Sequence, residues 1–152
     1  LDEYIKKEGE RIESFFKFSF VRNPWDRAVS LYFWRKNRPD ADQLKEGTSF
    51  ADFVRETPSD ILSDYDIFTI DGAAAVDRFV RYENLDTDLT AALAELGLPE
   101  ISLPRAKSGT RKTKDHYSLI YDDESIARIA EICAWEIDNL GYEFDDQRPT
   151  SE

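Results

Sequence analysis

The 152 residues include no methionine, a single cysteine and a single histidine. With Cys133 as its only thiol the chain cannot form an intrachain disulfide, and Cys133 and His116 alone are too few ligands for a structural zinc site. No apolar run approaches the roughly 20 residues that cross a membrane, and no signal-peptide pattern is present. Because the chain opens at Leu1 without a methionine, we expect it to be a piece of a longer protein.

Basic residues are also few relative to acidic ones, 20 against 32, and the formal net charge is −12. Such a chain lacks the basic surface that neutralises phosphates in non-specific nucleic-acid binding. The content of 41% hydrophobic and 13% aromatic residues is typical of a folded globular protein. We therefore expect one domain over residues 1–152, a frayed tail over residues 145–152 and no nucleic-acid partner.

The clearest local pattern lies between Phe15 and Asn37. Residues 15–21 are mostly aromatic or β-branched, which predicts a strand that is buried on both faces. Asn23 then suits the N-cap of a helix and Pro24 its first position, and the helix is expected to run to about Asn37.

The remaining elements follow from periodicity, caps and turn residues. Two strands that are each followed by a helix predict an α/β fold with parallel pairing. Two long strands are too few for a stable sheet, so we expect further strands from missing chain or from a partner. The other expected elements are a helix over 1–14, a helix over 49–56, an irregular segment over 58–66, a short strand over 68–70, a strand over 76–82, a helix from Leu85 to Gly97, and a helix from Asp122 or Asp123 to Gly141.

Arg22 and Ser30 form a candidate anion site. Arg22 follows the predicted strand, and ligands of open α/β sheets bind beyond the carboxyl ends of the strands. A guanidinium there can hold a phosphate through two parallel hydrogen bonds, and Ser30, two turns into the helix, can donate its hydroxyl to the same anion. Asp26 lies in the first turn, so the helix end itself is not expected to cradle the phosphate. The alternative is that Arg22 and Arg27 only form ion pairs around the helix start.

Three segments carry a family resemblance. Val21-Arg22-Asn23-Pro24-Trp25-Asp26-Arg27, with Ser30-Leu31-Tyr32, closely resembles the 3′-phosphate segment of sulfotransferases that use the donor PAPS (3′-phosphoadenosine 5′-phosphosulfate). Residues 77–85 resemble the second conserved strand and turn of that family, and residues 137–144 resemble its C-terminal ending. The resemblance spans Phe15 to Phe144 and is greatest to carbohydrate sulfotransferases of the heparan and chondroitin type and their bacterial relatives.

This resemblance implies a function and a site. Arg22 and Ser30 would bind the donor 3′-phosphate, and PAPS would transfer its sulfuryl group to a hydroxyl acceptor, expected to be a carbohydrate, with no metal. The fold would be a P-loop-NTPase-like parallel sheet flanked by helices. A bacterial protein of this kind is expected in the cytoplasm, and a Golgi protein only if an anchor precedes Leu1.

The densest basic cluster precedes the last predicted helix. It comprises Arg105, Lys107, Arg111, Lys112 and Lys114. The family has a loop here that contacts the donor phosphates, so the resemblance implies that Ser108, Arg111 and Lys112 bind the donor. The alternative is a solvated loop that balances nearby acidic residues.

The catalytic base stays unassigned. Sulfuryl transfer to a hydroxyl needs a group that takes the proton, and histidine suits that role near neutral pH. His116 is the one candidate of this type, but relatives usually place the base before the opening segment, and a structural role is the favoured interpretation. Glu83 follows a strand end and is likewise expected to cap or pair locally.

One part of the family pattern is missing. Working members have an earlier strand and a loop with a lysine and a hydroxyl residue that grips the 5′-phosphosulfate. Lys112-Thr113 lacks the glycines and the preceding strand of such a loop, so we expect a fold that is incomplete at its N-terminus. A P-loop-type small-molecule kinase and a non-catalytic nucleotide- or partner-binding relative remain the alternatives.

Overall fold

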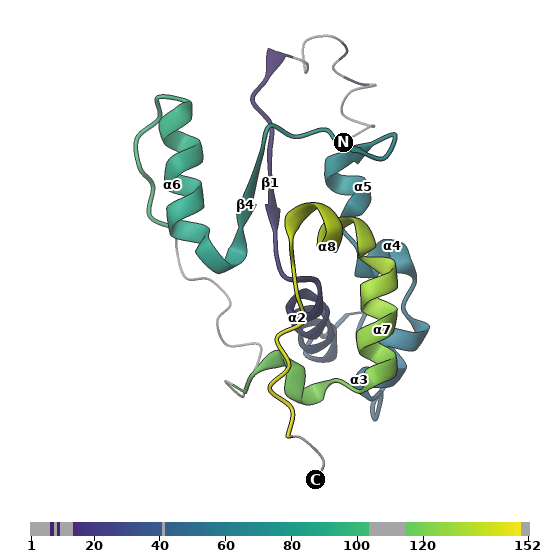
Figure 1. The fold of residues 1–152 in the computed structure, drawn as a ribbon. Coiled ribbons are helices and arrows are strands. Elements are labelled where there is room, and N and C mark those ends of the chain that lie inside the picture. Colours follow the sequence, from purple (N-terminus) through teal and green to yellow (C-terminus); the bar gives the residue numbers. More distant parts are fainter. Residues whose placement is uncertain (1–6, 8, 10–13, 41, 104–114, 150–152) are drawn as a thin grey trace. The chain divides into compact units, whose positions relative to one another are not determined.

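The computed structural model describes residues 7, 9, 14–40, 42–103 and 115–149. The chain divides into two compact units (Figure 1), and the expectation of one domain over residues 1–152 stays a prediction. The first unit combines Leu1–Arg22 with Asp64–Pro104, and the second combines Asn23–Ser63 with Arg105–Glu152. The helix expected over residues 1–14 lies almost wholly outside the described residues.

A parallel pair of strands forms the sheet of the first unit. Strand β1 (Phe18–Val21) pairs with β4 (Arg78–Arg81), and the register places Val21 opposite Arg81. At the start of the pair, the Lys17 N–H donates to Asp77 Oδ2 at 2.7 Å, and the Asp77 N–H donates to the Lys17 carbonyl at 2.7 Å. The predicted parallel pairing is therefore confirmed.

Helix α6 (Leu85–Glu95) packs against β4 and is joined to it by the 3₁₀ helix η2 (Tyr82–Asn84). The apolar cluster between them consists of Val80, Leu85, Leu89, Ala92, Leu93 and Leu103. Leu89 and Leu93 are buried as their spacing predicts, whereas Leu96 at the helix end is 40% exposed. Gly97 follows with φ +66°, the left-handed conformation that commonly ends a helix.

A small hairpin completes the first unit. Strands β2 (Thr69–Ile70) and β3 (Ala73–Ala74) pair antiparallel around Asp71 and Gly72, which both have positive φ. Two such residues are typical of the tight turns that join hairpin strands. Helix α5 (Tyr65–Phe68) precedes the hairpin, and its buried Phe68 ring meets that of Phe79 edge to face.

The expectation that the first strand is buried on both faces is wrong. Val21 is buried, but Phe18 is 37% exposed and Phe20 is 50% exposed. Burial of both faces needs layers above and below the sheet, and β1 has only β4 as a strand partner within the described ranges. The aromatic content of the strand predicted burial, but it does not reveal whether other elements pack on both faces.

Helices build the second unit. They are α2 (Pro24–Lys36), α3 (Phe50–Glu56), α4 (Ser59–Leu62), the 3₁₀ helix η3 (Tyr117–Ile120), α7 (Asp123–Ile132) and α8 (Ala134–Leu140). Helix α2 packs against α3, α7 and η3. Tyr32, Phe50 and Tyr121 are buried in this core with ring centroids 4.7 to 5.4 Å apart along the chain of contacts.

The caps predicted for these helices are confirmed. The side chains of Asn23, Ser49 and Asp122 accept backbone N–H groups at the starts of α2, α3 and α7. Gly141 ends α8 in the left-handed conformation. These signals depend on residues close in sequence, so the sequence alone places them well.

Two other expectations about the elements are wrong. Residues 58–66 are not irregular, because α4 and the first residues of α5 lie there. The last helix is not continuous but divides at Cys133, whose thiol lies 3.5 Å from the Leu62 carbonyl. Cys133 is buried, as its position on the apolar face predicts.

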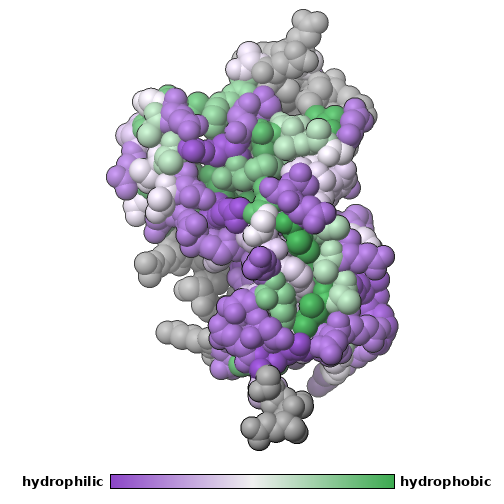
Figure 2. Space-filling view, in the orientation of Figure 1, coloured by the Kyte–Doolittle hydropathy of each residue, from purple (hydrophilic) through white to green (hydrophobic). Residues whose placement is uncertain are grey.

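Residues 145–149 belong to the tail that the sequence predicts to fray, and some of them make backbone hydrogen bonds. Asp145, Gln147 and Arg148 donate backbone hydrogen bonds to Tyr117, Ser118 and Asp146 respectively. Figure 2 shows a largely hydrophilic surface with smaller hydrophobic areas between the polar groups. No helix in the described part of the chain is both long and apolar enough to cross a membrane.

Candidate functional site

Arg22 lies at the carboxyl end of β1, as the sequence predicts. It is half-buried, and its guanidinium carbon lies 4.3 Å from the centroid of the Tyr82 ring. The strand register explains this contact, because Val21 pairs with Arg81 and the next residue of each strand is Arg22 and Tyr82. Arg22 therefore stands at the strand end where ligands of parallel sheets commonly bind.

The first turn of α2 has no N–H group left for a ligand. Pro24 has none, and the N–H groups of Trp25 and Asp26 donate to Asn23 Oδ1 at 3.1 and 3.2 Å. The Arg27 N–H donates to the Asn23 carbonyl at 2.8 Å. An anion near this helix start must therefore be held by side chains, while the helix contributes only the partial positive charge of its terminus.

Asn23 is itself held in place. Its side-chain nitrogen donates to the Glu143 carbonyl at 3.0 Å, in the segment that follows α8. Trp25 is buried beside it, and its indole nitrogen donates to the Ile126 carbonyl at 3.1 Å. The start of α2 is thus fixed to α7 and to the C-terminal segment.

Arg27 has a structural role. Its Nη1 donates to the carbonyls of Ile61 and Leu62 at 3.3 and 2.8 Å, at the end of α4. Those carbonyls are among the groups that a helix end leaves without intrahelical partners. Arg27 therefore stabilises the end of α4.

Ser30 lies in α2 and is half-buried. Within the described residues its hydroxyl makes no hydrogen bond to another group, so it can donate to a ligand. Arg22 is the last residue of the first unit and Ser30 belongs to the second. The other predicted donor-binding residues, Ser108, Arg111 and Lys112, lie outside the described residues.

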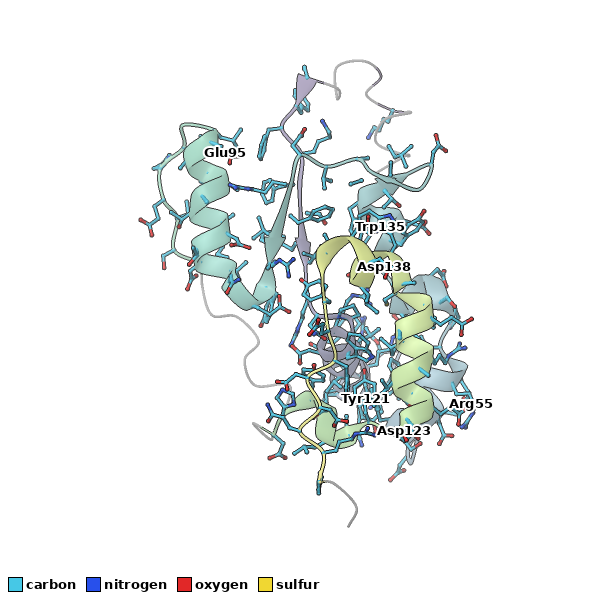
Figure 3. All side chains as sticks on the ribbon, in the orientation of Figure 1. Arg55, Glu95, Tyr121, Asp123, Trp135 and Asp138 are labelled. Atoms are coloured by element: carbon cyan, nitrogen blue, oxygen red, sulfur yellow. The ribbon has the colours of Figure 1, made fainter. Side chains whose placement is uncertain are left out.

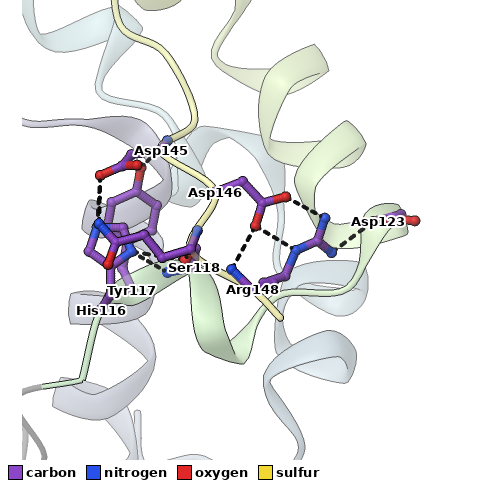
Figure 4. A network of polar contacts seen from close by, with 8 residues as sticks. His116, Tyr117, Ser118, Asp123, Asp145, Asp146 and Arg148 are labelled. Atoms are coloured by element: carbon purple, nitrogen blue, oxygen red, sulfur yellow. Dashed lines mark hydrogen bonds and ion pairs between the residues drawn. The ribbon is translucent and has the colours of Figure 1, made fainter. Parts of the chain in front are cut away.

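His116 lies in a network of polar contacts (Figure 4). Its Nδ1 accepts the Ser118 N–H at 3.4 Å and lies 2.8 Å from Ser118 Oγ, and its Nε2 lies 3.3 Å from Asp145 Oδ2. With Nδ1 as an acceptor, the ring hydrogen is on Nε2 and is donated to Asp145. Both ring nitrogens are engaged, which supports the structural interpretation of His116.

The order Asp145, His116, Ser118 has the composition of a hydrolase triad, but its geometry serves another purpose. Ser118 is fully buried, so its hydroxyl cannot attack a substrate. The Ser118 Oγ instead accepts the Gln147 N–H at 3.0 Å, and Tyr117 Oη accepts the Asp145 N–H at 2.7 Å. The network thus fastens the C-terminal segment to η3.

Arg148 joins the C-terminal segment to α7. It pairs with Asp146 at 2.8 Å and with Asp123 at 2.7 Å. Hydrogen bonds from Arg148 lower the pKa of Asp146 to about 2. Asp146 and Arg148 therefore stay ionised at neutral pH, and their contacts hold this segment against α7.

Glu83 belongs to the first unit, whereas the His116 network belongs to the second. Glu83 is exposed in η2 after β4. The described ranges contain no cluster of three or more histidine, cysteine, aspartate or glutamate side chains arranged to hold a metal ion. Tyr82 is a candidate that sequence reasoning missed, although its place as the last residue of the predicted strand over 76–82 was visible.

Comparison with known families decides the classification. The model of the sulfotransferase family matches residues 2–145. The chain belongs to the sulfotransferase family. The mixed α/β architecture with a small parallel sheet and flanking helices agrees with that membership, and sulfuryl transfer is the general activity of the family.

This sulfotransferase is also similar to a protein described as uncharacterized from Archaeoglobus fulgidus. The two are 30% identical over 98 residues, which cover 58% of this chain and 72% of the archaeal protein. No solved structure matches the sulfotransferase.

Proposed function

We propose that this chain binds PAPS through Arg22 and Ser30 and transfers its sulfuryl group to a hydroxyl, expected to be on a carbohydrate. The observation that carries the proposal is the position of Arg22 at the carboxyl end of a parallel strand, followed directly by the helix that carries Ser30. The Arg22 guanidinium, followed in sequence by the Ser30 hydroxyl, suits the doubly charged 3′-phosphate of the donor.

The start of α2 explains why side chains carry this role. Its first N–H groups are already bonded to Asn23, so they cannot wrap around a phosphate. Binding would then depend on the Arg22 guanidinium and on the Ser30 hydroxyl, with the α2 dipole adding a favourable field. Ser108, Arg111 and Lys112 remain predictions for the other donor phosphates.

The reaction would be an in-line displacement at sulfur. The acceptor oxygen forms a bond to sulfur, the bond between sulfur and the bridging phosphate oxygen breaks, and the acceptor proton passes to a base that we leave unassigned. The 3′-phosphate is remote from the reacting atoms, so Arg22 and Ser30 act by positioning the donor. The family resemblance also supports a P-loop-NTPase-like fold, whose donor loop has no counterpart in residues 1–152.

Calorimetric titration with 3′-phosphoadenosine 5′-phosphate (PAP) tests the proposal. Arg22→Ala is expected to weaken PAP binding roughly ten- to a hundredfold, because a charge-assisted pair of hydrogen bonds is lost. Ser30→Ala should weaken it less, since one neutral donor is removed. Binding of adenosine 5′-phosphate (AMP), which lacks the 3′-phosphate, should change little in either variant.

Arg55→Ala is the matched control, because Arg55 lies in α3 with its side chain 54% exposed and paired with Asp52 (Figure 3). It should bind PAP as the unmodified protein does. The proposal fails if PAP does not bind, or if Arg22→Ala binds it normally. Displacement of PAP by ATP with magnesium, but not by PAPS, would favour the kinase alternative.

A further inference from the structure

The contact between Arg22 and Tyr82 is suited to orienting the arginine side chain. The guanidinium carbon lies 4.3 Å from the ring centroid, well inside the range of a cation–π interaction. Tyr82 is 53% exposed, so its ring is not needed to fill the apolar core. A large aromatic side chain that is half exposed and covers one cation calls for an explanation beyond packing.

The contact with Tyr82 does not itself occupy the hydrogen-bonding edges of Arg22. A guanidinium carries its N–H donors in its own plane, and an aromatic ring attracts it through its face. The stack therefore restricts the rotation of the Arg22 side chain without using any N–H donor. An arginine that is held this way loses less conformational freedom when it binds a phosphate.

Tyr82 stands on a rigid support within the same unit. It follows β4 directly, and the preceding Arg81 N–H donates to Asp88 Oδ2 at 2.9 Å in α6. Below it, Val80 is fully buried against Leu89 and Leu93 of α6. The strand pairing then brings the ring to Arg22, since the register aligns the ends of β1 and β4.

We propose that Tyr82 is a positioning residue that holds the Arg22 guanidinium in the orientation that receives the 3′-phosphate of the donor. The inference rests on the proposed function, because it assigns Arg22 to that phosphate. Tyr82 acts through Arg22 and makes its contribution only to ligands that carry the 3′-phosphate. It thereby contributes to the preference for PAP over AMP.

Substitution of Tyr82 separates this role from a contact with the nucleoside. Tyr82→Leu removes the aromatic face and is expected to weaken PAP binding roughly two- to fivefold, the equivalent of one exposed cation–π contact, while AMP binding stays the same. Tyr82→Phe and Tyr82→Trp keep an aromatic face and should bind PAP as tightly as the unmodified protein. Equal losses for PAP and AMP, or no loss for either, would overturn the proposal.

Combining the substitutions shows whether Tyr82 works through Arg22. In the Arg22→Ala background, Tyr82→Leu should cause no further loss of PAP affinity, so the two effects are not additive. If Arg22→Ala alone leaves PAP binding intact, the proposed function fails and the role of Tyr82 falls with it. If Arg22→Ala weakens binding but Tyr82→Leu does not, only the role of Tyr82 is refuted.

A measurement without ligand tests the stack itself. The Arg22 Nε–H resonance should be shifted by the ring current of Tyr82 in the NMR spectrum. Tyr82→Leu should remove that shift and Tyr82→Phe should keep it, with unchanged backbone resonances in β1 and α6. An Arg22 resonance that is the same in all variants would show that the ring does not hold the guanidinium.

Discussion

Tyr121 shows how single polar groups stabilise the aromatic core of the second unit. Its side chain is buried at the start of α7, and its hydroxyl donates to the Trp25 carbonyl at 2.8 Å (Figure 3). Burial raises the pKa of Tyr121 far above its ordinary value, so the hydroxyl stays protonated and remains a donor. The bond ties the segment before α7 to the first turn of α2, which follows Arg22.

Tyr121→Phe should lower the free energy of unfolding by about 1 kcal/mol, the net contribution of one buried hydrogen bond. The loss is modest because the Phe ring keeps the packing. Urea denaturation followed by tryptophan fluorescence measures it, with Tyr82→Phe as the control that leaves stability unchanged. Equal stability of Tyr121→Phe and the unmodified protein would mean that the hydroxyl contributes nothing.

At the scale of elements, the sequence predicted what depends on near neighbours. Asn23 with Pro24, Ser49 and Asp122 start helices because each cap is bonded within its own first turn. The division of the last helix at Cys133 and the helix α4 were missed. Both depend on distant groups: Arg27 binds the carbonyls of α4, and the Cys133 thiol meets Leu62.

In the candidate site, too, the sequence predicts what depends on neighbouring residues and misses what depends on distant ones. Arg22 and Ser30 could be predicted as candidates because strand, cap and helix follow one another in sequence. The Arg22–Tyr82 stack was not found, since it exists only once β1 and β4 pair in one particular register. The exposure of Phe18 and Phe20 also depends on which elements cover the sheet, which composition does not reveal.

The contacts of Asp77 at the start of the β1–β4 pair predict that the stability of the fold falls at acidic pH. Asp77 accepts the Lys17 N–H and pairs with its ammonium at 3.3 Å, and these contacts, the backbone hydrogen bond first, hold the pKa of Asp77 below its usual value. A carboxylate whose pKa is lower in the folded state stabilises the fold above its unfolded pKa of about 3.9. That contribution is lost as the pH falls through the folded pKa.

Asp77→Asn should therefore lower stability by about 0.5 to 1 kcal/mol at pH 7 and flatten the loss of stability below about pH 4. Urea denaturation followed by circular dichroism from pH 7 to pH 2.5 measures both effects. Asp71→Asn, in the hairpin turn where asparagine tolerates positive φ, is the control that should keep the full acid response. Identical pH profiles for Asp77→Asn and the unmodified protein would contradict this role.

At the scale of the whole molecule, the two units differ in their tryptophan content. All three tryptophans, Trp25, Trp34 and Trp135, belong to the second unit. The first unit depends on a two-stranded parallel sheet, a hairpin and α6, with a small apolar cluster around Val80. Two-stranded sheets are marginal on their own, so the first unit is expected to be the less stable one.

Circular dichroism reports the unfolding of both units, whereas tryptophan fluorescence reports the second unit only. Without ligand, the change in circular dichroism should therefore begin at a lower urea concentration than the change in tryptophan fluorescence. Saturating PAP should bring the two transitions together. If Arg22 of the first unit binds PAP as we propose, the ligand stabilises that unit by about 2.7 kcal/mol at a hundred times its Kd. Coincident transitions without ligand would show that the units unfold as one.

The long separation between β1 and β4 also affects how the chain acquires its structure during synthesis. Lys17 and Asp77, which join the starts of these strands, are 60 residues apart. At about 5 to 20 residues per second, a ribosome needs roughly 3 to 12 seconds to make the residues between them. During that interval β1 has emerged without β4, and Phe18 and Phe20 stay exposed on an unpaired strand. The nascent segment therefore presents an unpaired strand edge, and slower translation of the intervening residues is expected to increase its aggregation.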